Sequence, residues 1–186
     1  MLKRLLNKTS LFHLILIAVI AALGIAVKPV VVPLAQLVTG PFVPGGAAAG
    51  GIYMLFVVLA ASLTHVRGAG TLCGLCQGLL ILALGVPGTH GAASLITYTL
   101  PGIAVDLAFL LLARKKVAMP ACFVGGIAAN VAGTVAVNFA LFHMPLIPLL
   151  LSLCLAAFSG GLGGLGAWGI TRQLKKWGII HEKERT

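Results

Sequence analysis

The sequence predicts an all-α membrane protein, built as a bundle of six transmembrane helices with both termini in the cytoplasm. Of its 186 residues, 60% are hydrophobic and only 9% are charged, and the mean hydropathy is +1.11. Soluble domains carry about 25% charged residues. The charged residues lie in short clusters between apolar runs. These observations predict one integral membrane domain over residues 1–186, with a short cytoplasmic segment at 1–10 and a basic cytoplasmic tail at 171–186.

The first helix is predicted at 11–27, directly after a basic N-terminal segment. At 1.5 Å per residue this helix spans about 26 Å, close to the thickness of the hydrocarbon core. Lys28 and Pro29 are expected to end it. The next stretch, 30–45, contains closely spaced Pro and Gly residues, which argue against one continuous helix. It is therefore predicted to be an ordered Pro/Gly-rich outer loop, partly buried in the membrane.

Five further helices are predicted at apolar runs that end in turn residues or basic clusters, at 46–64, 69–86, 92–113, 118–142 and 146–170. Glycine accounts for 24 residues and recurs at a spacing of four, at Gly46 and Gly50, Gly74 and Gly78, and Gly160 and Gly164. Small residues at this spacing let helix backbones approach closely, so tight packing between the helices is expected.

The basic residues that produce the net charge of +10 follow the ends of the predicted helices, at Arg67, at 114–116 and in the C-terminal tail. No basic face with interleaved aromatic residues occurs, which argues against nucleic-acid binding. With the N-terminus in the cytoplasm, six spans place these basic residues on the inner side, and Lys28 is the exception among the outer turns. This bias predicts the orientation of a multi-pass membrane protein with both termini in the cytoplasm.

The sequence offers no sign of enzyme chemistry. It contains no pair of carboxylates, no activated nucleophile and no phosphate-binding Gly loop that opens a helix. No metal or other cofactor is expected. The four cysteines lie in apolar segments that contain no further metal ligands, at Cys73, Cys76, Cys122 and Cys154. Since no nucleotide-binding motif is present, uphill transport would need a partner that supplies the energy.

A stripe of small side chains follows the first predicted helix, because Ala18, Ala22 and Ala26 repeat at every fourth residue. Lipid tails gain nothing from such a stripe, whereas the backbone of another helix can approach it closely. Two interpretations remain open. The stripe packs against a neighbouring helix of this chain, or it is a docking surface for a separate membrane protein.

Several polar side chains fall at one depth in the predicted bundle. Counting the helix rise from the nearest inner basic residue places Tyr53, Thr97, Tyr98 and Asn130 roughly 21–25 Å from the inner surface. Pro101 frees the carbonyl of Thr97 at the same depth. These features predict a small cavity in the outer half, capped by the loop at 30–45.

The candidate substrate-binding residues of this cavity are Tyr53, Thr97, Tyr98, Asn130, Asn138, His90 and Lys28. Asn138, His90 and His143 lie nearer the outer surface. Each type also has a structural alternative: a tyrosine that packs in the bundle, an asparagine that joins helices, or a histidine that caps an outer turn.

Asp106 is the acid inside the predicted membrane region, and Gln77 on the third helix lies at a similar depth. Two polar groups at matched depth would satisfy one another in apolar surroundings, so a structural pair is predicted. The alternative is a proton relay through Asp106, although no second acid is present in the spans to receive the proton.

Several segments resemble the substrate-binding S components of energy-coupling factor (ECF) transporters, and the likeness extends over nearly the whole chain. They are ALGIAVKP at 22–29, GPFVPGG at 40–46, THG at 89–91 and TYTLPG at 97–102. The resemblance implies a membrane subunit that binds a vitamin or other micronutrient and works with a transmembrane T component and two ATPase subunits. It also implies that Ala18, Ala22 and Ala26 match the docking motif of the family's first helix.

Within that family the sequence is most similar to the hydroxymethylpyrimidine/thiamine-precursor group. Members that bind thiamine carry tryptophans near the site, whereas Trp168 and Trp177 lie at the other end of this protein. Nickel and cobalt members begin with Met-His, whereas this chain begins Met1-Leu2. Since the outer half offers no acid, a neutral planar heterocycle or an anion near Lys28 is expected rather than a strongly cationic ligand.

Two other classes of function compete with this interpretation. A structural or assembly subunit of a larger membrane complex would keep the alanine stripe and the glycine packing but bind no ligand. A small proton-coupled carrier would use Asp106 instead of a partner.

Overall fold

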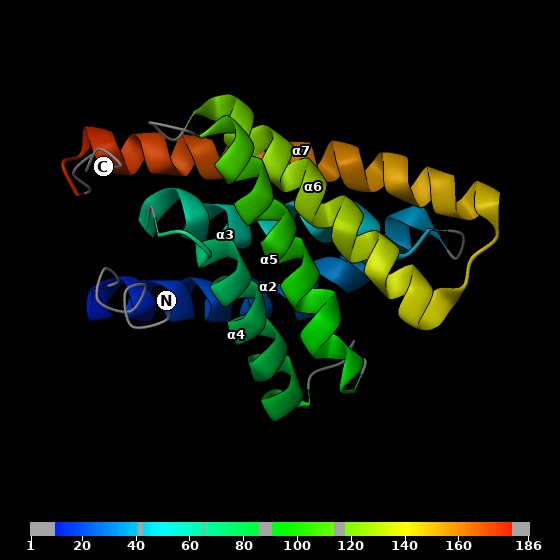
Figure 1. Ribbon diagram of the computed structural model, residues 1–186. Coiled ribbons are helices and arrows are strands. Elements are labelled where there is room, and N and C mark those ends of the chain that lie inside the picture. The colour runs from blue at the N-terminus through cyan, green and yellow to red at the C-terminus, as the bar shows by residue number, and fades with distance from the viewer. Residues whose placement is uncertain (1–9, 41–42, 65, 86–90, 114–117, 180–186) are drawn as a thin grey trace.

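The computed structural model describes residues 10–40, 43–64, 66–85, 91–113 and 118–179. All the regular structure in these ranges is helical, which confirms the predicted all-α class (Figure 1). The helices are α2 (Leu11–Thr39), α3 (Gly45–Thr64), α4 (Ala69–Leu84), α5 (Ala93–Leu112), α6 (Met119–Val137) with the short π-helix η1 (Asn138–Phe142), and α7 (Leu146–Lys176).

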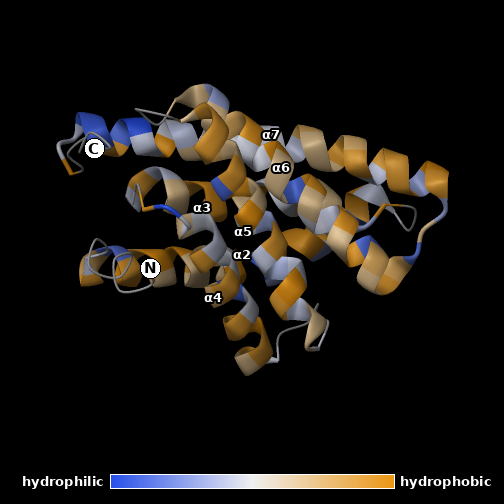
Figure 2. Ribbon diagram, viewed as in Figure 1, coloured by the Kyte–Doolittle hydropathy of each residue, from blue (hydrophilic) through white to orange (hydrophobic). Residues whose placement is uncertain are grey.

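Five of the described helical segments are long and apolar enough to cross a membrane: α2, α3, α5, α6 with η1, and α7. The remaining helix, α4, is apolar but has only 16 residues, so the count of six transmembrane helices stays a prediction. Figure 2 shows that apolar residues cover most of the helices, with hydrophilic residues at the C-terminal end of α7. That helix continues to Lys176, so part of the predicted tail is helical.

The prediction of a Pro/Gly-rich loop over 30–45 is wrong for residues 30–39, which are helical. Pro29 and Pro33 lie inside α2, which continues to Thr39. A helix tolerates proline in a membrane because the lost backbone bond is local, whereas a loop would leave many backbone groups without partners. Gln36 then closes the short connection to α3, because its Oε1 accepts a hydrogen bond from the Gly45 N–H at 2.5 Å and its amide nitrogen donates to the carbonyl of Gly40.

Glycine allows the helices to touch backbone to backbone at three crossings. A Cβ added to Gly102 of α5 would lie 2.2 Å from the Gly70 carbonyl oxygen of α4, and real Cβ atoms essentially never approach closer than 3.0 Å. The same clash occurs between Gly126 of α6 and Gly160 of α7, at 2.1 Å, and between Gly163 of α7 and Gly51 of α3, at 1.9 Å. The packing expected from the glycine spacing is therefore present.

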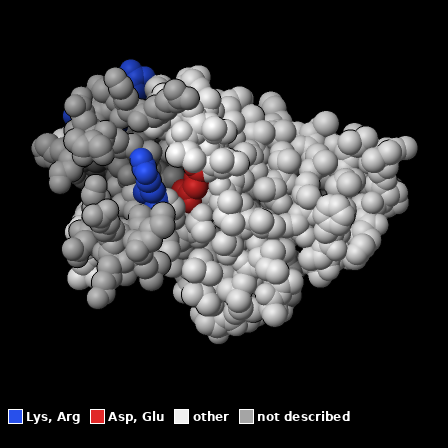
Figure 3. Space-filling model, viewed as in Figure 1, with Lys and Arg blue, Asp and Glu red and all other residues white. Residues whose placement is uncertain are grey.

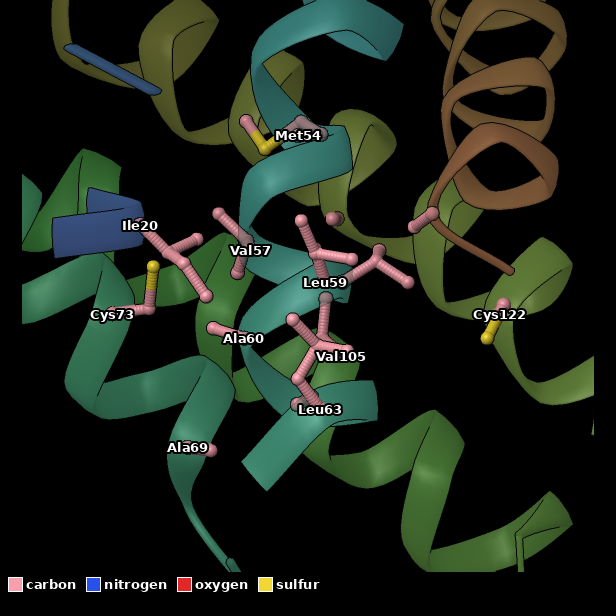
Figure 4. Close-up of a cluster of buried hydrophobic side chains, with 14 of the residues drawn as sticks. Ile20, Met54, Val57, Leu59, Ala60, Leu63, Ala69, Cys73, Val105 and Cys122 are labelled. Carbon is pink, nitrogen blue, oxygen red and sulfur yellow. The ribbon is translucent and has the colours of Figure 1, made fainter. Parts of the chain in front are cut away.

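The most buried of the long helices is α3, which packs against α2, α6 and α7. Its apolar side chains form the centre of the main core cluster, together with residues from α2, α4, α5 and α6 (Figure 4). Labelled members in that view include Ile20, Val57, Leu59, Cys73 and Val105. This core holds α3 in a fixed position, and the first turns of α3 form one wall of the cavity described below.

The first turn of α2 and the last turn of α7 lie at the same end of the bundle (Figure 1). On the face shown in Figure 3, the described Lys and Arg side chains gather at this end and the rest of the face is almost free of charge. Near the same end, the guanidinium of Arg172 lies 5.3 Å from the Trp168 ring centroid. We call this the basic end, and the sequence-based orientation places it in the cytoplasm.

Candidate functional site

A cavity of about 400 Å³ lies between α2, α3, α4, α5 and α6, in the half of the bundle away from the basic end. Phe142 of η1 and Met144 in the following turn complete its wall. The polar and aromatic side chains used below are all among its lining residues: Lys28, Tyr53, Gln77, Thr97, Tyr98 and Asn130. Five of these six are predicted site residues, and Gln77 was predicted to have another role.

Lys28 is the charged residue of the described lining, and two tyrosine rings surround its ammonium group. The Nζ atom donates a hydrogen bond to the Tyr98 hydroxyl, and it lies 4.3 Å from the Tyr98 ring centroid and 5.1 Å from that of Tyr53. Both distances are within the range of a cation–π interaction. Because α2 continues past Lys28, this residue lies in the cavity wall rather than on an outer turn.

Asn130 of α6 joins three helices at the cavity. Its amide nitrogen donates to the carbonyl of Ala47 on α3 at 3.0 Å and to that of Ala156 on α7 at 2.9 Å. The side chain is only 1% exposed, and it fits because Gly50 has no Cβ, which would come within 1.8 Å of the Asn130 Oδ1. Asn130 therefore has a structural role in this position while it also lines the cavity.

Asn138 supports the cavity wall without being part of the lining. At the start of η1, its Oδ1 accepts a hydrogen bond from the Met144 N–H at 2.9 Å, and its backbone carbonyl accepts one from His143 at the same distance. Nothing in the sequence indicates that the helix widens here, which turns the Asn138 side chain toward the next connection. His143 is exposed, and the predicted site residue His90 lies outside the described residues.

The predicted pair of Asp106 with Gln77 is wrong. The Asp106 carboxylate accepts hydrogen bonds from the N–H groups of Gly70 and Thr71, at 3.0 and 2.7 Å, and from the Thr71 hydroxyl at 2.6 Å. These donors belong to the first turn of α4, where N–H groups lack partners within the helix and the helix dipole favours a negative charge. An acid is therefore satisfied better there than by an amide.

Gln77 lines the cavity instead of pairing with Asp106. It lies two turns along α4 from Gly70, and its side chain is 4% exposed. Its amide nitrogen has no hydrogen-bond partner. The spacing of Gly70, Gly74 and Gln77 places all three on one face of the helix, and this signal could have assigned Gln77 to the bundle interior.

The alanine stripe faces away from the bundle. Ala18, Ala22 and Ala26 are exposed, whereas Ala21 is fully buried and Gly24 packs against Gln77 and Phe56. The face of α2 that holds Ala21 and Gly24 packs against α3 and α4. Among the described residues, the interpretation that the stripe packs against a neighbouring helix of this chain is therefore wrong. Its role as a docking surface for a separate protein stays a prediction.

The described residues contain no group of three or more His, Cys, Asp or Glu side chains that could hold a metal ion. All four cysteines have free thiols, with Cys73 and Cys122 buried. The polar atoms of the described cavity lining come from lysine, tyrosine, threonine, glutamine, asparagine and the backbone. Such groups bind organic molecules by hydrogen bonding and ring contacts.

Comparison with known proteins gave two matches. Residues 12–132 match the model of a family, ABC_cobalt, described as "ABC-type cobalt transport system, permease component". A solved structure titled "Crystal structure of an S-component of ECF transporter" has the same fold, with a TM-score of 0.73 and 22% sequence identity over 91% of this chain and 87% of that chain. The search of curated proteins found no significant match. The apolar helices and these matches indicate a multi-pass protein of the cell membrane.

Proposed function

Because the chain belongs to the family of permease components of ABC-type cobalt transport systems, we propose that it is the substrate-binding membrane subunit of an uptake transporter. Its fold, which is that of an ECF transporter S component, supports the proposal. The observation that carries it is the cavity of about 400 Å³ among five helices, lined by Lys28, two tyrosines and five further side chains that can form hydrogen bonds. This volume is within the usual range for small-molecule sites.

The substrate we propose is a small heterocycle of vitamin or vitamin-precursor size, as in the hydroxymethylpyrimidine group. The rings of Tyr53 and Tyr98 can contact a planar ligand, and Thr97 and Asn130 present polar atoms at the same level. A bare divalent cation such as cobalt fits less well. The described lining has no carboxylate, imidazole or thiol to coordinate a metal, and the Lys28 ammonium would repel it.

We propose that energy comes from an ECF T component and two ATPase subunits. The sequence has no nucleotide-binding loop of its own. The stripe of Ala18, Ala22 and Ala26 is exposed on α2 and offers small side chains over which another membrane helix can pack closely. The proton-coupled alternative loses its main support, because α4 satisfies Asp106 and the described cavity lining does not include it.

Thermal unfolding of the purified protein with a panel of water-soluble vitamins and their precursors tests the proposal. A ligand at 100 times its dissociation constant adds about 2.7 kcal/mol to the free energy of unfolding, which a melting curve detects readily. We expect Thr134→Phe, which fills the cavity from α6, to abolish this stabilisation.

Ala132→Phe is the matched control, because Ala132 lies on the same helix but lines an outer groove instead of the cavity. It should keep the stabilisation. If no panel compound stabilises the protein, or if Thr134→Phe responds as strongly as Ala132→Phe, the proposed cavity does not bind the substrate.

A further inference from the structure

Gln77 is a buried amide with an unused donor. It lines the cavity, its side chain is only 4% exposed, and its Nε2 has no hydrogen-bond partner. The nitrogen lies against Gly24 of α2, where an added Cβ would come within 2.4 Å of it. A half-turn about the last side-chain bond exchanges the nitrogen and the oxygen of the amide, and because Gln77 lines the cavity we expect this exchange to direct the donor to it. Since buried donors are almost always paired, a partner for Gln77 is expected there.

Lys28 is a cation without a counter-ion among the described residues. Its ammonium group has three donors, and one of them is given to the Tyr98 hydroxyl. Asp106 is the acid of the described chain, and the first turn of α4 already satisfies its carboxylate. A lysine inside a helix bundle normally pairs with an acceptor. The described lining offers Lys28 rings and a hydroxyl but no anion.

Lys28 and Gln77 lie on adjacent parts of one wall of the cavity. Gln77 packs on Gly24, and Lys28 follows Gly24 by four residues on α2, which is about 6 Å further along the same helix face. Gly74, one turn before Gln77, packs on the backbone of Tyr98, the residue that accepts the Lys28 hydrogen bond. Lys28, Gln77 and Tyr98 therefore line neighbouring parts of the cavity wall.

We infer that Lys28 and Gln77 form a subsite for an anionic group of the substrate, a carboxylate or a phosphate. This inference rests on the proposed function, because it specifies the chemistry of the substrate that the same cavity binds. An anion accepts from both donors at once, and it neutralises the lysine inside the bundle. Charge-assisted hydrogen bonds of this kind are about twice as strong as neutral ones. Ionised carboxylates and phosphates both present oxygen atoms that accept hydrogen bonds, so the subsite is expected to bind either kind of anion.

Matched pairs of probes test the inference, since each pair shares a scaffold and differs in the anionic group. The carboxylate pairs are nicotinate with nicotinamide and pantothenate with pantothenol, and the phosphate pair is hydroxymethylpyrimidine phosphate with hydroxymethylpyrimidine. We expect the anionic member of at least one pair to bind at least about tenfold more tightly to the purified protein than its neutral partner. The pair that responds distinguishes carboxylate from phosphate.

Two near-isosteric variants assign the effect to the subsite. Lys28→Met and Gln77→Met should each weaken binding of the anionic member by about 10- to 100-fold and leave the affinity of its neutral partner nearly unchanged. Without any probe, Gln77→Met should melt at the same temperature as the parent protein or higher, because no hydrogen bond of the Gln77 amide nitrogen is lost. A merely structural Gln77 would instead lower the melting temperature. Cys76→Ala, beside Gln77 but outside the described lining, is the control and should bind like the parent.

The outcomes separate this inference from the proposed function. If neutral members bind as tightly as their anionic partners, the anionic subsite is refuted while the proposed function stands. If an anionic member binds equally well to the parent, Lys28→Met and Gln77→Met, the subsite is elsewhere and the inference is also refuted. If no compound of the vitamin panel or of these pairs binds, both proposals are refuted.

Discussion

Replacing Gly126 by alanine tests how backbone packing between α6 and α7 supports the cavity. A Cβ at this position would lie 2.1 Å from the Gly160 carbonyl oxygen, and real Cβ atoms stay at least 3.0 Å away, so the helices must separate by about 0.9 Å. The neighbouring atoms are backbone and cannot move aside as a flexible side chain would. Gly126→Ala is therefore expected to shift α6 as a unit.

The shift reaches the cavity through Asn130, one turn further along α6. Its hydrogen bond to the Ala156 carbonyl of α7 is 2.9 Å long. A separation of about 0.9 Å along that bond stretches it to about 3.8 Å, which is beyond hydrogen-bonding distance. Overpacking of this kind typically costs about 1–3 kcal/mol. We expect ligand affinity to fall together with stability, because Asn130 also lines the cavity.

Gly169→Ala on α7 is the matched control, since nothing lies within 4 Å of a Cβ placed there. Alanine is favoured over glycine in a helix interior by about 1 kcal/mol, so this variant should be slightly more stable than the parent protein. Since Gly126→Ala gains the same helix preference, the two variants should differ by the cost of overpacking alone, about 1–3 kcal/mol, or about 2–12 °C in melting temperature for a chain of this size. Equal melting temperatures for Gly126→Ala and Gly169→Ala would refute the packing argument.

Three further predictions follow from the exposed and buried faces of the bundle. Ala22→Leu should reduce co-purification with the T component but leave thermal stability unchanged. As a control, Ala21→Leu should lower thermal stability, because Ala21 is fully buried. Unchanged co-purification of Ala22→Leu would exclude the stripe as a docking surface. Asp106→Leu leaves donors in the first turn of α4 without an acceptor, so it should lower the free energy of unfolding by about 1–3 kcal/mol in melting experiments. The effect of Asp106→Asn should be milder. An Asp106→Leu variant as stable as the parent protein would contradict this prediction. In a cysteine-free background, an impermeant thiol reagent added outside cells should label Met144→Cys but not Gly68→Cys, and the reverse pattern would invert the proposed orientation.

The helix positions and the level of the polar residues could be predicted because both depend on local regularity. Apolar runs of membrane length, ended by Gly, Pro or basic residues, gave the helix bounds to within a few residues. The exceptions are the range 30–45 and the end of α7. A constant rise per residue then placed Tyr53, Thr97, Tyr98 and Asn130 at one depth, and the structure arranges these four around one cavity. Their role in binding stays a prediction.

The partners of individual polar groups could not be predicted from depth alone. Depth gives the position along the bundle axis, whereas pairing depends on the rotation of each helix and on which neighbours it touches. The helix-rise count gives Asp106 and Gln77 similar depths, yet the close crossing of α4 and α5 at Gly70 and Gly102 brings the first turn of α4, two turns before Gln77, to the carboxylate. The propensity of proline to end helices likewise failed at Pro29, because a membrane penalises an unpaired backbone more than a helix with a local defect.

The continuation of α2 through Pro29 and Pro33 gives this one helix two surfaces with separate roles. Ala18, Ala22 and Ala26 face outward, while Gly24 and Lys28 face the interior and reach Gln77 and the tyrosines. If the helix ended at Lys28, as the sequence predicts, the lysine would lie in an outer turn instead of the cavity wall. Since the two surfaces share a rigid helix but no side chain, changes at Ala22 should affect partner docking alone and changes at Lys28 should affect ligand binding alone.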